Sequence, residues 1–358
     1  MTAPTRTPAR TSGRTSARTP PRTSVRTSVW VGFFAVLLAL PFVLNAHWLI
    51  NIAVFTLMYA VLATAWNLVG GFAGYPSLGH GALFGIGAYA EAVWFRGHDV
   101  GAGYGPLLAA APIGVAVAVA ALPIAWIAMR TRAEVFAIVT ITLLFITQTL
   151  AFNLHGLTGG AQGIEMPMAP FAAGTFEWPY YYALLVLLAL AMGTALAVAR
   201  SKLGLSLLAV RSDEDKARGV GVHVTLVKLL AFGLSAAFTA AAGAIWAYYI
   251  SFVYPQFAID PFITIAMVLM TYLGGRGTLW GPVLGAFLLA PAQQLFAYHF
   301  GSSQLYLVAY AAVFLVVILA LPRGIVPTMT AAGHPKLTTL TDVAPRHRKP
   351  ARRERIRS

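Results

Sequence analysis

The sequence contains no cysteine. Disulfide bonds, thiolate metal sites and thiol catalysis are therefore excluded. The eight histidines are scattered along the chain, and none shows the HExxH spacing of a helical zinc site. Neither metal-dependent nor thiol-dependent chemistry is predicted, and we expect no cofactor.

Charged residues are also scarce, because they make up only 10% of the 358 residues while 58% are hydrophobic. Soluble domains carry about 25% charged residues. The apolar residues lie in repeated runs close to the length, about 20 residues, that crosses a bilayer as a helix. The composition therefore predicts an all-α integral membrane protein. We expect about ten transmembrane helices, at residues 29–45, 48–69, 78–95, 107–129, 134–153, 179–199, 228–254, 261–275, 279–300 and 304–321.

The basic residues, which give a formal net charge of +14, are distributed unevenly. If the N-terminus is cytosolic, 24 of the 25 Lys and Arg residues fall in predicted cytosolic segments, counting Lys228 at a boundary, and Arg96 is the exception. This bias matches the positive-inside rule and predicts that both termini are cytosolic. No aromatic and basic module for nucleic acid is visible, so we expect no nucleic-acid partner. The cytosolic segments of this arrangement are 1–28, 70–77, 130–133, 200–227, 275–278 and 322–358.

The two ends of the chain differ from the membrane region. Residues 1–28 repeat arginine every fourth position among Thr, Ser and Pro, which predicts a disordered cytosolic tail because proline and like-charge repulsion oppose a helix. We do not expect a cleavable signal peptide, since the charged region is too long. The predicted organisation is a tail at 1–28, a transmembrane domain at 29–325 with a large cytosolic loop at 200–227, and a basic cytosolic tail at 326–358.

Energy for transport has no visible source within the chain. None of the five lysines follows a glycine, so the phosphate-binding GxxxxGK[ST] loop is absent. Ion-driven carriers usually hold ionisable residues within the membrane, and Glu91 is the only acidic residue well inside a predicted span. A partner must therefore supply the energy, unless the protein is a passive channel. An intramembrane enzyme is a third possibility, but no catalytic constellation supports it, so we do not expect an enzyme.

The large cytosolic loop contains a short, polar helix signal. Ser212 is positioned to cap a helix that opens with acidic residues and closes with basic ones, an order that suits the helix dipole. Two glycines offer left-handed stops. The helix is either a solvated connector or a docking element for a cytosolic motor domain. The residues assigned to docking are Arg211, Ser212, Asp213, Glu214, Asp215, Gly219 and Gly221.

Polar residues in the membrane region suggest where a pathway lies. Residues 70–87 include seven glycines, which serve either close helix packing or a broken helix that lines a pathway. Ser77 and His80 are the polar groups there that suit a pathway, although a lone histidine is more often a packing residue. Ala236, Ala240 and Ala244 predict a packing seam, within the chain or against a partner.

The fifth predicted span carries a second polar group. Thr140, Thr147 and Gln148 are spaced so that they share one helical face. Threonines in membrane helices often bond to carbonyls of their own helix, but Gln148 does so less easily. The face is therefore either pathway lining or self-satisfied helix polarity.

Five motifs follow one another along the chain, at residues 67–89, 136–140, 157–164, 209–222 and 273–286. In this order they resemble the permeases of branched-chain amino acid ABC uptake systems, the LivM/LivH family, and more closely the LivM branch. The resemblance covers about residues 60–325. Three departures stand out: the arginine-rich N-terminus, Phe145 where many relatives have a polar residue, and Ser212, Lys216 and Gly219 where acidic or alanine residues are more usual.

The resemblance implies the fold and role of an ABC importer permease in the bacterial plasma (inner) membrane, without an ATPase site of its own. It implies a second homologous permease, two cytosolic ATPase subunits and an extracytoplasmic solute-binding protein as partners. The loop around residues 211–221 resembles the family's coupling segment. The expected substrates are branched-chain or other hydrophobic amino acids, with urea, short amides or aromatic acids as the alternative.

Overall fold

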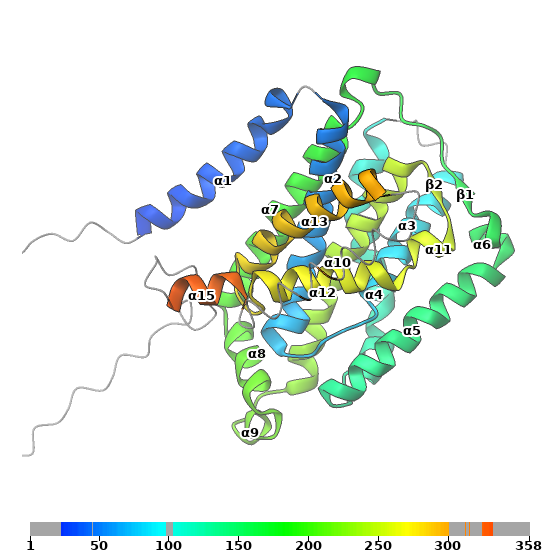
Figure 1. The fold of residues 1–358 in the computed structure, drawn as a ribbon. Helices are drawn as coiled ribbons and strands as arrows, with labels where there is room; N and C mark the ends of the chain where they lie inside the picture. Colours follow the sequence, from blue (N-terminus) through cyan, green and yellow to red (C-terminus); the bar gives the residue numbers. More distant parts are fainter. Residues whose placement is uncertain are drawn as a thin grey trace, which may run out of the picture. The chain divides into compact units, whose positions relative to one another are not determined.

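The computed structural model describes residues 23–44, 46–97, 103–300 and 324–331, together with Ala312 and Leu315. Apart from these two residues, the predicted tenth span at 304–321 lies outside the described residues, as do most of both tails. The chain divides into two units, of which the first is formed in its described part by helix α1 (Thr23–Val43) (Figure 1). This helix begins before the predicted start of the first span at residue 29.

The second unit begins at residue 44 and is almost entirely helical. Short helical turns occur as α6 (His155–Thr158), η2 (Gly160–Gln162), η3 (Ala173–Thr175), α11 (Pro255–Ala258) and α15 (Ile325–Ala331). The longer helices are α2 (His47–Trp66), α3 (His80–Gly97), α4 (Gly105–Ala128), α5 (Ala133–Asn153), α7 (Trp178–Arg200), α8 (Lys202–Ser212), α10 (Val224–Ile250), α12 (Pro261–Gly274) and α13 (Gly281–Phe300).

Six helical stretches among the described residues are long and apolar enough to cross a membrane. They coincide with six of the predicted runs. The composition-based assignment to an all-α membrane protein therefore holds in this part of the chain. The six stretches are His47–Ala73, Gly105–Ala128, Ala133–Asn153, Ala173–Arg200, Val224–Ile250 and Pro255–Gly274.

Helix α10 is the centre of the second unit, where it packs against α3 and α4 and also contacts α2 and α7 (Figure 1). Small residues permit this approach. A Cβ on Gly87 of α3 would overlap the carbonyl of Ala240 in α10, and a Cβ on Gly243 would overlap the carbonyl of Phe84. Ala240 is fully buried, as are Ala236 and Ala244. The predicted alanine seam is thus an internal packing surface.

The chain stays helical past the end of α2, but with a different hydrogen-bond pattern. It continues into η1 (Asn67–Ala73), a π-helix, and the chain then leaves the helix at Gly74, whose φ is +78°. Such π-helical turns are rare and frequently mark functional sites. The glycine-rich region is therefore a broken helix followed by a non-helical stretch before α3.

Two short strands join segments that are distant in the sequence. Strand β1 (Ile164–Glu165) pairs antiparallel with β2 (Phe252–Val253), so that Ile164 lies opposite Val253. The connection between α5 and α7 is thereby fixed to the chain that follows α10. Nothing in the sequence predicted this pairing.

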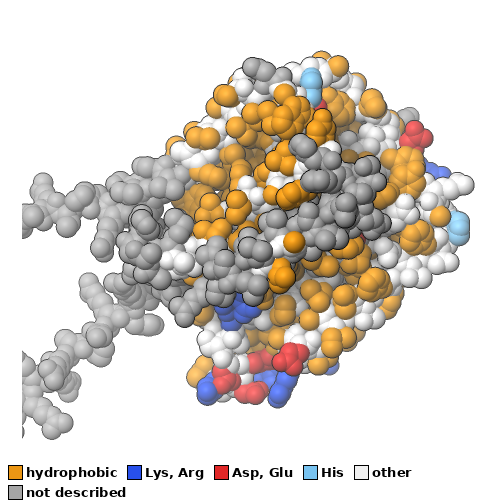
Figure 2. All heavy atoms as spheres, viewed as in Figure 1, with side chains coloured by type: hydrophobic (Ala, Val, Ile, Leu, Met, Phe, Trp, Pro, Cys, Tyr) orange, Lys and Arg blue, Asp and Glu red, His pale blue; other side chains and the backbone are white. Residues whose placement is uncertain are grey.

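Much of the charge on the face drawn in Figure 2 lies in one region. Figure 2 shows Lys, Arg, Asp and Glu side chains gathered at the end of the second unit that carries α9 (Glu214–Gly219), whereas apolar side chains cover much of the rest of this face. Large apolar residues such as Leu108, Ile127 and Ile138 are 65–76% exposed. A surface this apolar fits contact with lipid or with a partner helix rather than with water.

Candidate functional site

Four of the predicted cytosolic segments meet at the end of the second unit that carries α9. A hollow of about 420 Å³ is lined by residues that follow η1, by the turn between α4 and α5, and by α8 and α9. The segment at 275–278 joins them through contacts with η1. The predicted arrangement places these segments on one side of the membrane, and the structure brings them together.

Helix α8 and the short helix α9 form the polar element of this site. Ser212 was expected to cap the second helix, but it is the last residue of α8 and its hydroxyl donates to the carbonyl of Leu208 at 2.9 Å. Asp213 is the cap instead, since its carboxylate accepts from the backbone N–H of Lys216 at 3.0 Å. The prediction was wrong by one residue because the hydroxyl satisfies its own helix.

Asp213 and Lys216 also form an exposed ion pair at 2.8 Å. The side-chain hydrogen bond from Lys216 is the main cause that lowers the pKa of Asp213, and the same contact raises the pKa of Lys216. The side chain of Lys216 is 86% exposed and that of Asp215 79%. These residues present alternating charge on the outer face of α9.

The C-terminal end of α9 has the geometry of a Schellman motif. The N–H of Gly221 donates to the carbonyl of Arg218 at 2.9 Å, and that of Val222 donates to Ala217 at 3.1 Å. Gly221 has a φ of +87°, whereas Gly219 is not among the glycines with positive φ. Only one of the two predicted stops is therefore left-handed, because Gly219 is still the last residue of the helix.

Arg211 points into the protein rather than toward a partner. Its guanidinium donates to the carbonyl of Gly71 in η1 at 2.7 Å. Burial, with a smaller contribution from Arg276, lowers the pKa of Arg211. A Cβ on Gly74 would lie 2.9 Å from the Arg211 side chain, so the glycine leaves room for this contact. The expected docking residue thus ties α8 to the broken helix.

Glu214 is also turned inward. Its carboxylate accepts hydrogen bonds from Arg218 at 2.6 Å and from Lys228 of α10 at 3.3 Å, and its other oxygen accepts from the hydroxyl of Tyr75. We expected Arg211, Asp213 and Glu214 to supply charge pairs for a partner. Among these three, the structure leaves Asp213 on the outer face.

An asparagine that the sequence analysis did not single out holds η1 to the 275–278 segment. Asn67 is buried, its Nδ2 donates to the carbonyl of Thr278 at 2.8 Å, and its Oδ1 accepts from the N–H of Gly277 at 2.8 Å. Both backbone groups would otherwise be buried without partners. A lone amide within an apolar run was the available signal.

His80 belongs to a closed hydrogen-bond chain. It is fully buried, with Nε2 2.7 Å from the Ser235 hydroxyl and Nδ1 2.8 Å from that of Ser77. Since Ser235 donates to the carbonyl of Ala65 at 2.6 Å, His80 Nε2 carries the hydrogen that Ser235 accepts. His80 is therefore a satisfied packing residue in this state.

Three of the five candidate pathway residues line one small cavity. Ser77, Thr140 and Thr147 share a cavity of about 90 Å³ with apolar residues of α3, α4, α5 and α10. Thr140 and Thr147 donate to carbonyls of their own helix, and Thr140 also accepts from the N–H of Leu78 at 2.9 Å. The cavity is apolar with a few hydroxyl oxygens.

Gln148 does not line this cavity. Its Nε2 donates to the carbonyl of Ile259, the residue that directly follows α11, at 2.9 Å. Gln148 was expected to bond to its own helix less easily than a threonine does. Its Nε2 donates instead to another segment of the chain. Ser77, Thr140 and Thr147 thus line the cavity together, whereas His80, which is hydrogen-bonded to Ser77, and Gln148 do not line it.

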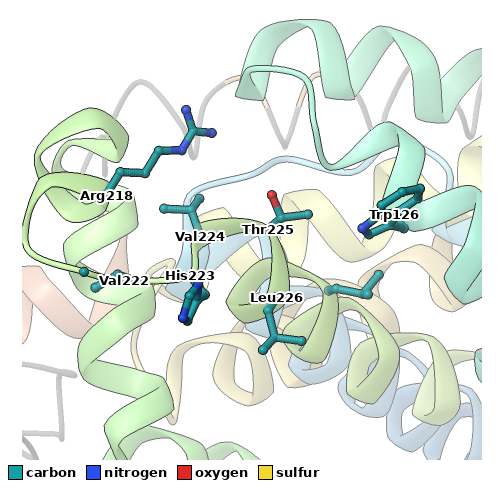
Figure 3. Close-up of a pocket in the computed structure, with 9 residues that line it drawn as sticks. Trp126, Arg218, Val222, His223, Val224, Thr225 and Leu226 are labelled. Carbon is teal, nitrogen blue, oxygen red and sulfur yellow. The ribbon is translucent and has the colours of Figure 1, made fainter.

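A larger hollow of about 670 Å³ lies beside α9. Figure 3 shows Arg218 and Trp126 on opposite sides of it, with the residues from Val222 to Leu226 between them. Arg130 lies 3.7 Å from the centre of the Trp126 ring. Tryptophan and arginine in such pairs are typical of the membrane–water interface.

Among the described residues, no group of three His, Asp or Glu side chains could hold a metal ion.

Comparison with known proteins identifies the chain's relatives. The family model for the permease component of the branched-chain amino acid transport system matches residues 48–321. The high-affinity branched-chain amino acid transport system permease protein LivM of Salmonella typhimurium is 29% identical over 275 residues, covering 69% of this chain and 63% of the relative. LivM of Escherichia coli is 28% identical over 294 residues, covering 74% of this chain and 67% of the relative.

No solved structure matches the chain significantly. The chain spans about two thirds of the length of the curated relatives that it matches. The family match nevertheless covers most of this chain, including η1, α5, the α8–α9 element and the 275–278 segment. The matched region is that of a transport permease and not of an ATPase domain. The chain therefore belongs to the family of branched-chain amino acid transport system permease components.

Proposed function

We propose that this chain forms the transmembrane pathway of an ATP-driven ABC importer for branched-chain or other hydrophobic amino acids. In this proposal it works with a second homologous permease, two cytosolic ATPase subunits and an extracytoplasmic solute-binding protein in the bacterial inner membrane. The alternative substrates are urea, short amides or aromatic acids. The mostly apolar cavity with hydroxyls from Ser77, Thr140 and Thr147 favours a solute with an aliphatic part.

The observation that carries the proposal is the α8–α9 element. It presents the exposed charges of Asp215 and Lys216 at the end of the second unit where four predicted cytosolic segments meet. Its inner residues reach the broken helix through Arg211. A partner that binds the outer face would thus contact an element bonded directly to the membrane region. We assign this side to the cytosol, with ten spans and both termini cytosolic.

Reconstitution tests the proposal. The permease pair, the ATPase subunits and the binding protein are placed in liposomes, and uptake of labelled leucine is compared with uptake of urea and of an aromatic acid. Leucine uptake that requires ATP and the binding protein is expected. Leucine flux without ATP would indicate a passive channel, and uptake of urea in place of leucine would assign the alternative substrate.

A further inference from the structure

The lysine at the start of α10 has no part in the predicted site, yet it is deeply buried. The Lys228 side chain is 0% exposed. An ammonium group in such surroundings needs an opposite charge and hydrogen-bond acceptors. Among the described residues, Glu214 is the carboxylate within 4 Å of it, at 3.3 Å. Burial of this charge is therefore balanced by a residue of α9.

The ring of Tyr75 completes the surroundings of Lys228. The Nζ atom of Lys228 lies 4.1 Å from the centre of that ring, a distance at which a cation is attracted by an aromatic face. The hydroxyl of the same tyrosine donates to Glu214. Burial and this hydrogen bond raise the pKa of Tyr75, so the hydroxyl keeps its proton as a donor. Tyr75, Glu214 and Lys228, which we call the anchor cluster, are thus mutually bonded.

The three residues come from three different parts of the fold. Glu214 is the first residue of α9, Lys228 lies in the second turn of α10, and Tyr75 lies in the stretch between η1 and α3. A displacement of α9 therefore cannot occur without breaking these contacts or moving both other parts. The cluster contrasts with Asp215 and Lys216 on the outer face, whose ion pairs in the described structure are with Arg218 and Asp213 of the α9 segment.

Tyr75 leads directly to the cavity wall. Its ring packs edge-to-face on Phe136 with ring centres 5.9 Å apart, and Phe136 lines the cavity. Two residues further along the chain is Ser77, which also lines it, and the next N–H, of Leu78, is held by Thr140. One side chain thus contacts α9 at its hydroxyl and the cavity wall at its ring.

We propose that the anchor cluster transmits movement of α9 to the cavity, with Tyr75 and Lys228 as positioning residues for transport. This inference rests on the proposed function, because it requires an ATPase that moves α9. Transmission needs an element that is biased by both sites, not merely one lying between them. The hydroxyl of Tyr75 is the group to test for this role, because its hydrogen bond joins α9 to a residue whose ring packs against the cavity wall.

The test uses the full complex of permease pair, ATPases and binding protein in liposomes. Tyr75→Phe removes the hydroxyl and keeps the ring contacts with Lys228 and Phe136. We expect ATPase association to stay at the parent level, while stimulation of ATP hydrolysis by the loaded binding protein and uptake per ATP both fall at least about fivefold, the lower end of typical coupling between sites. Tyr272→Phe is the matched control, because this exposed tyrosine accepts from Arg276 outside the cluster.

A second variant separates transmission from folding. Glu214→Leu alone leaves Lys228 buried without a carboxylate, so reduced expression is expected. The double variant Glu214→Leu with Lys228→Met removes both charges and also the oxygen that accepts from the Tyr75 hydroxyl, and we expect it to recover assembly without recovering coupling. A merely structural ion pair would recover both.

The outcomes distinguish the two proposals. If the parent complex shows no ATP-dependent import, the proposed function and the anchor cluster both fail. If the parent imports and Tyr75→Phe and the double variant keep the parent ratio of uptake to ATP hydrolysis, only the anchor cluster is refuted. Loss of ATPase association in Tyr75→Phe would also refute it, because the hydroxyl lies behind the docking face.

Discussion

Replacing Asn67 by leucine tests how η1 is held in place. Leucine is close to asparagine in size but can neither donate to the carbonyl of Thr278 nor accept from the N–H of Gly277, each now bonded at 2.8 Å. Because both backbone groups are buried, neither gains water in exchange. An unsatisfied buried group costs about 1–3 kcal/mol. The variant should therefore lose about 2–6 kcal/mol of unfolding free energy, less a small gain from the more apolar side chain.

Asn51→Leu is the matched control at the other end of α2. Asn51 donates to the hydroxyl of Tyr249 at 2.7 Å in a half-buried setting, so its loss should cost about 1 kcal/mol. Both variants and the parent are unfolded by SDS titration in mixed micelles and followed by circular dichroism. The reasoning is refuted if Asn67→Leu lies within about 0.5 kcal/mol of the parent, or if Asn51→Leu is the more costly change.

Three further predictions follow from named contacts. Gly87→Ala should destabilise the protein by about 1–3 kcal/mol, because its Cβ would overlap the Ala240 carbonyl. Gly193→Ala should instead stabilise it by about 0.5–1 kcal/mol, because a Cβ at this position of α7 meets open space. Equal melting temperatures of the two variants would contradict this prediction. Gly221→Val should lower ATPase association more than Gly219→Val. Of these two glycines only Gly221 has a positive φ, +87°, at which a β-branched residue is strained by about 1–3 kcal/mol. The amount of ATPase subunit that co-purifies with each variant checks this prediction. The pKa of Asp213 is lowered in the folded protein, so its stabilisation of α9 is present above the unfolded pKa of about 3.9 and is lost as pH falls through the lower folded pKa. Hydrogen exchange of the Lys216 amide should therefore accelerate at acid pH in the parent, and Asp213→Asn should remove this pH dependence. The same pH dependence in the variant would show that another group causes it.

Hydropathy alone predicted much of the helical framework, because a bilayer requires long apolar runs whatever the tertiary contacts. The same signal could not predict η1. Residues 67–73 continue the apolar pattern of α2, and only the contacts of Asn67 with a segment about 210 residues away show why the helix changes its hydrogen bonding. Pairing of Ile164 with Val253 was invisible for the same reason, since it depends on long-range register.

The docking helix was predicted in place but not in detail. Ser212 and Asp213 are both good capping residues, and the choice between them depends on whether α8 continues through Ser212. Acidic residues in a first turn suggest a solvated face, which holds for Asp215. Glu214 differs because its partner Lys228 lies on another helix, and no helical periodicity connects residues 14 positions apart across a turn.

The most direct test of the central claim uses the absence of cysteine in the chain. One variant carries a single cysteine in place of the exposed Lys216 of α9. A second carries it in place of the exposed Glu165 of β1, in the connection between α5 and α7. In intact cells, an impermeant thiol reagent should label the cysteine at 165 and not the one at 216, and a short bifunctional crosslinker in inverted membrane vesicles should join only the cysteine at 216 to the ATPase subunit. Labelling of the cysteine at 216 from outside, or failure of that cysteine to crosslink in an importing complex, would contradict the account.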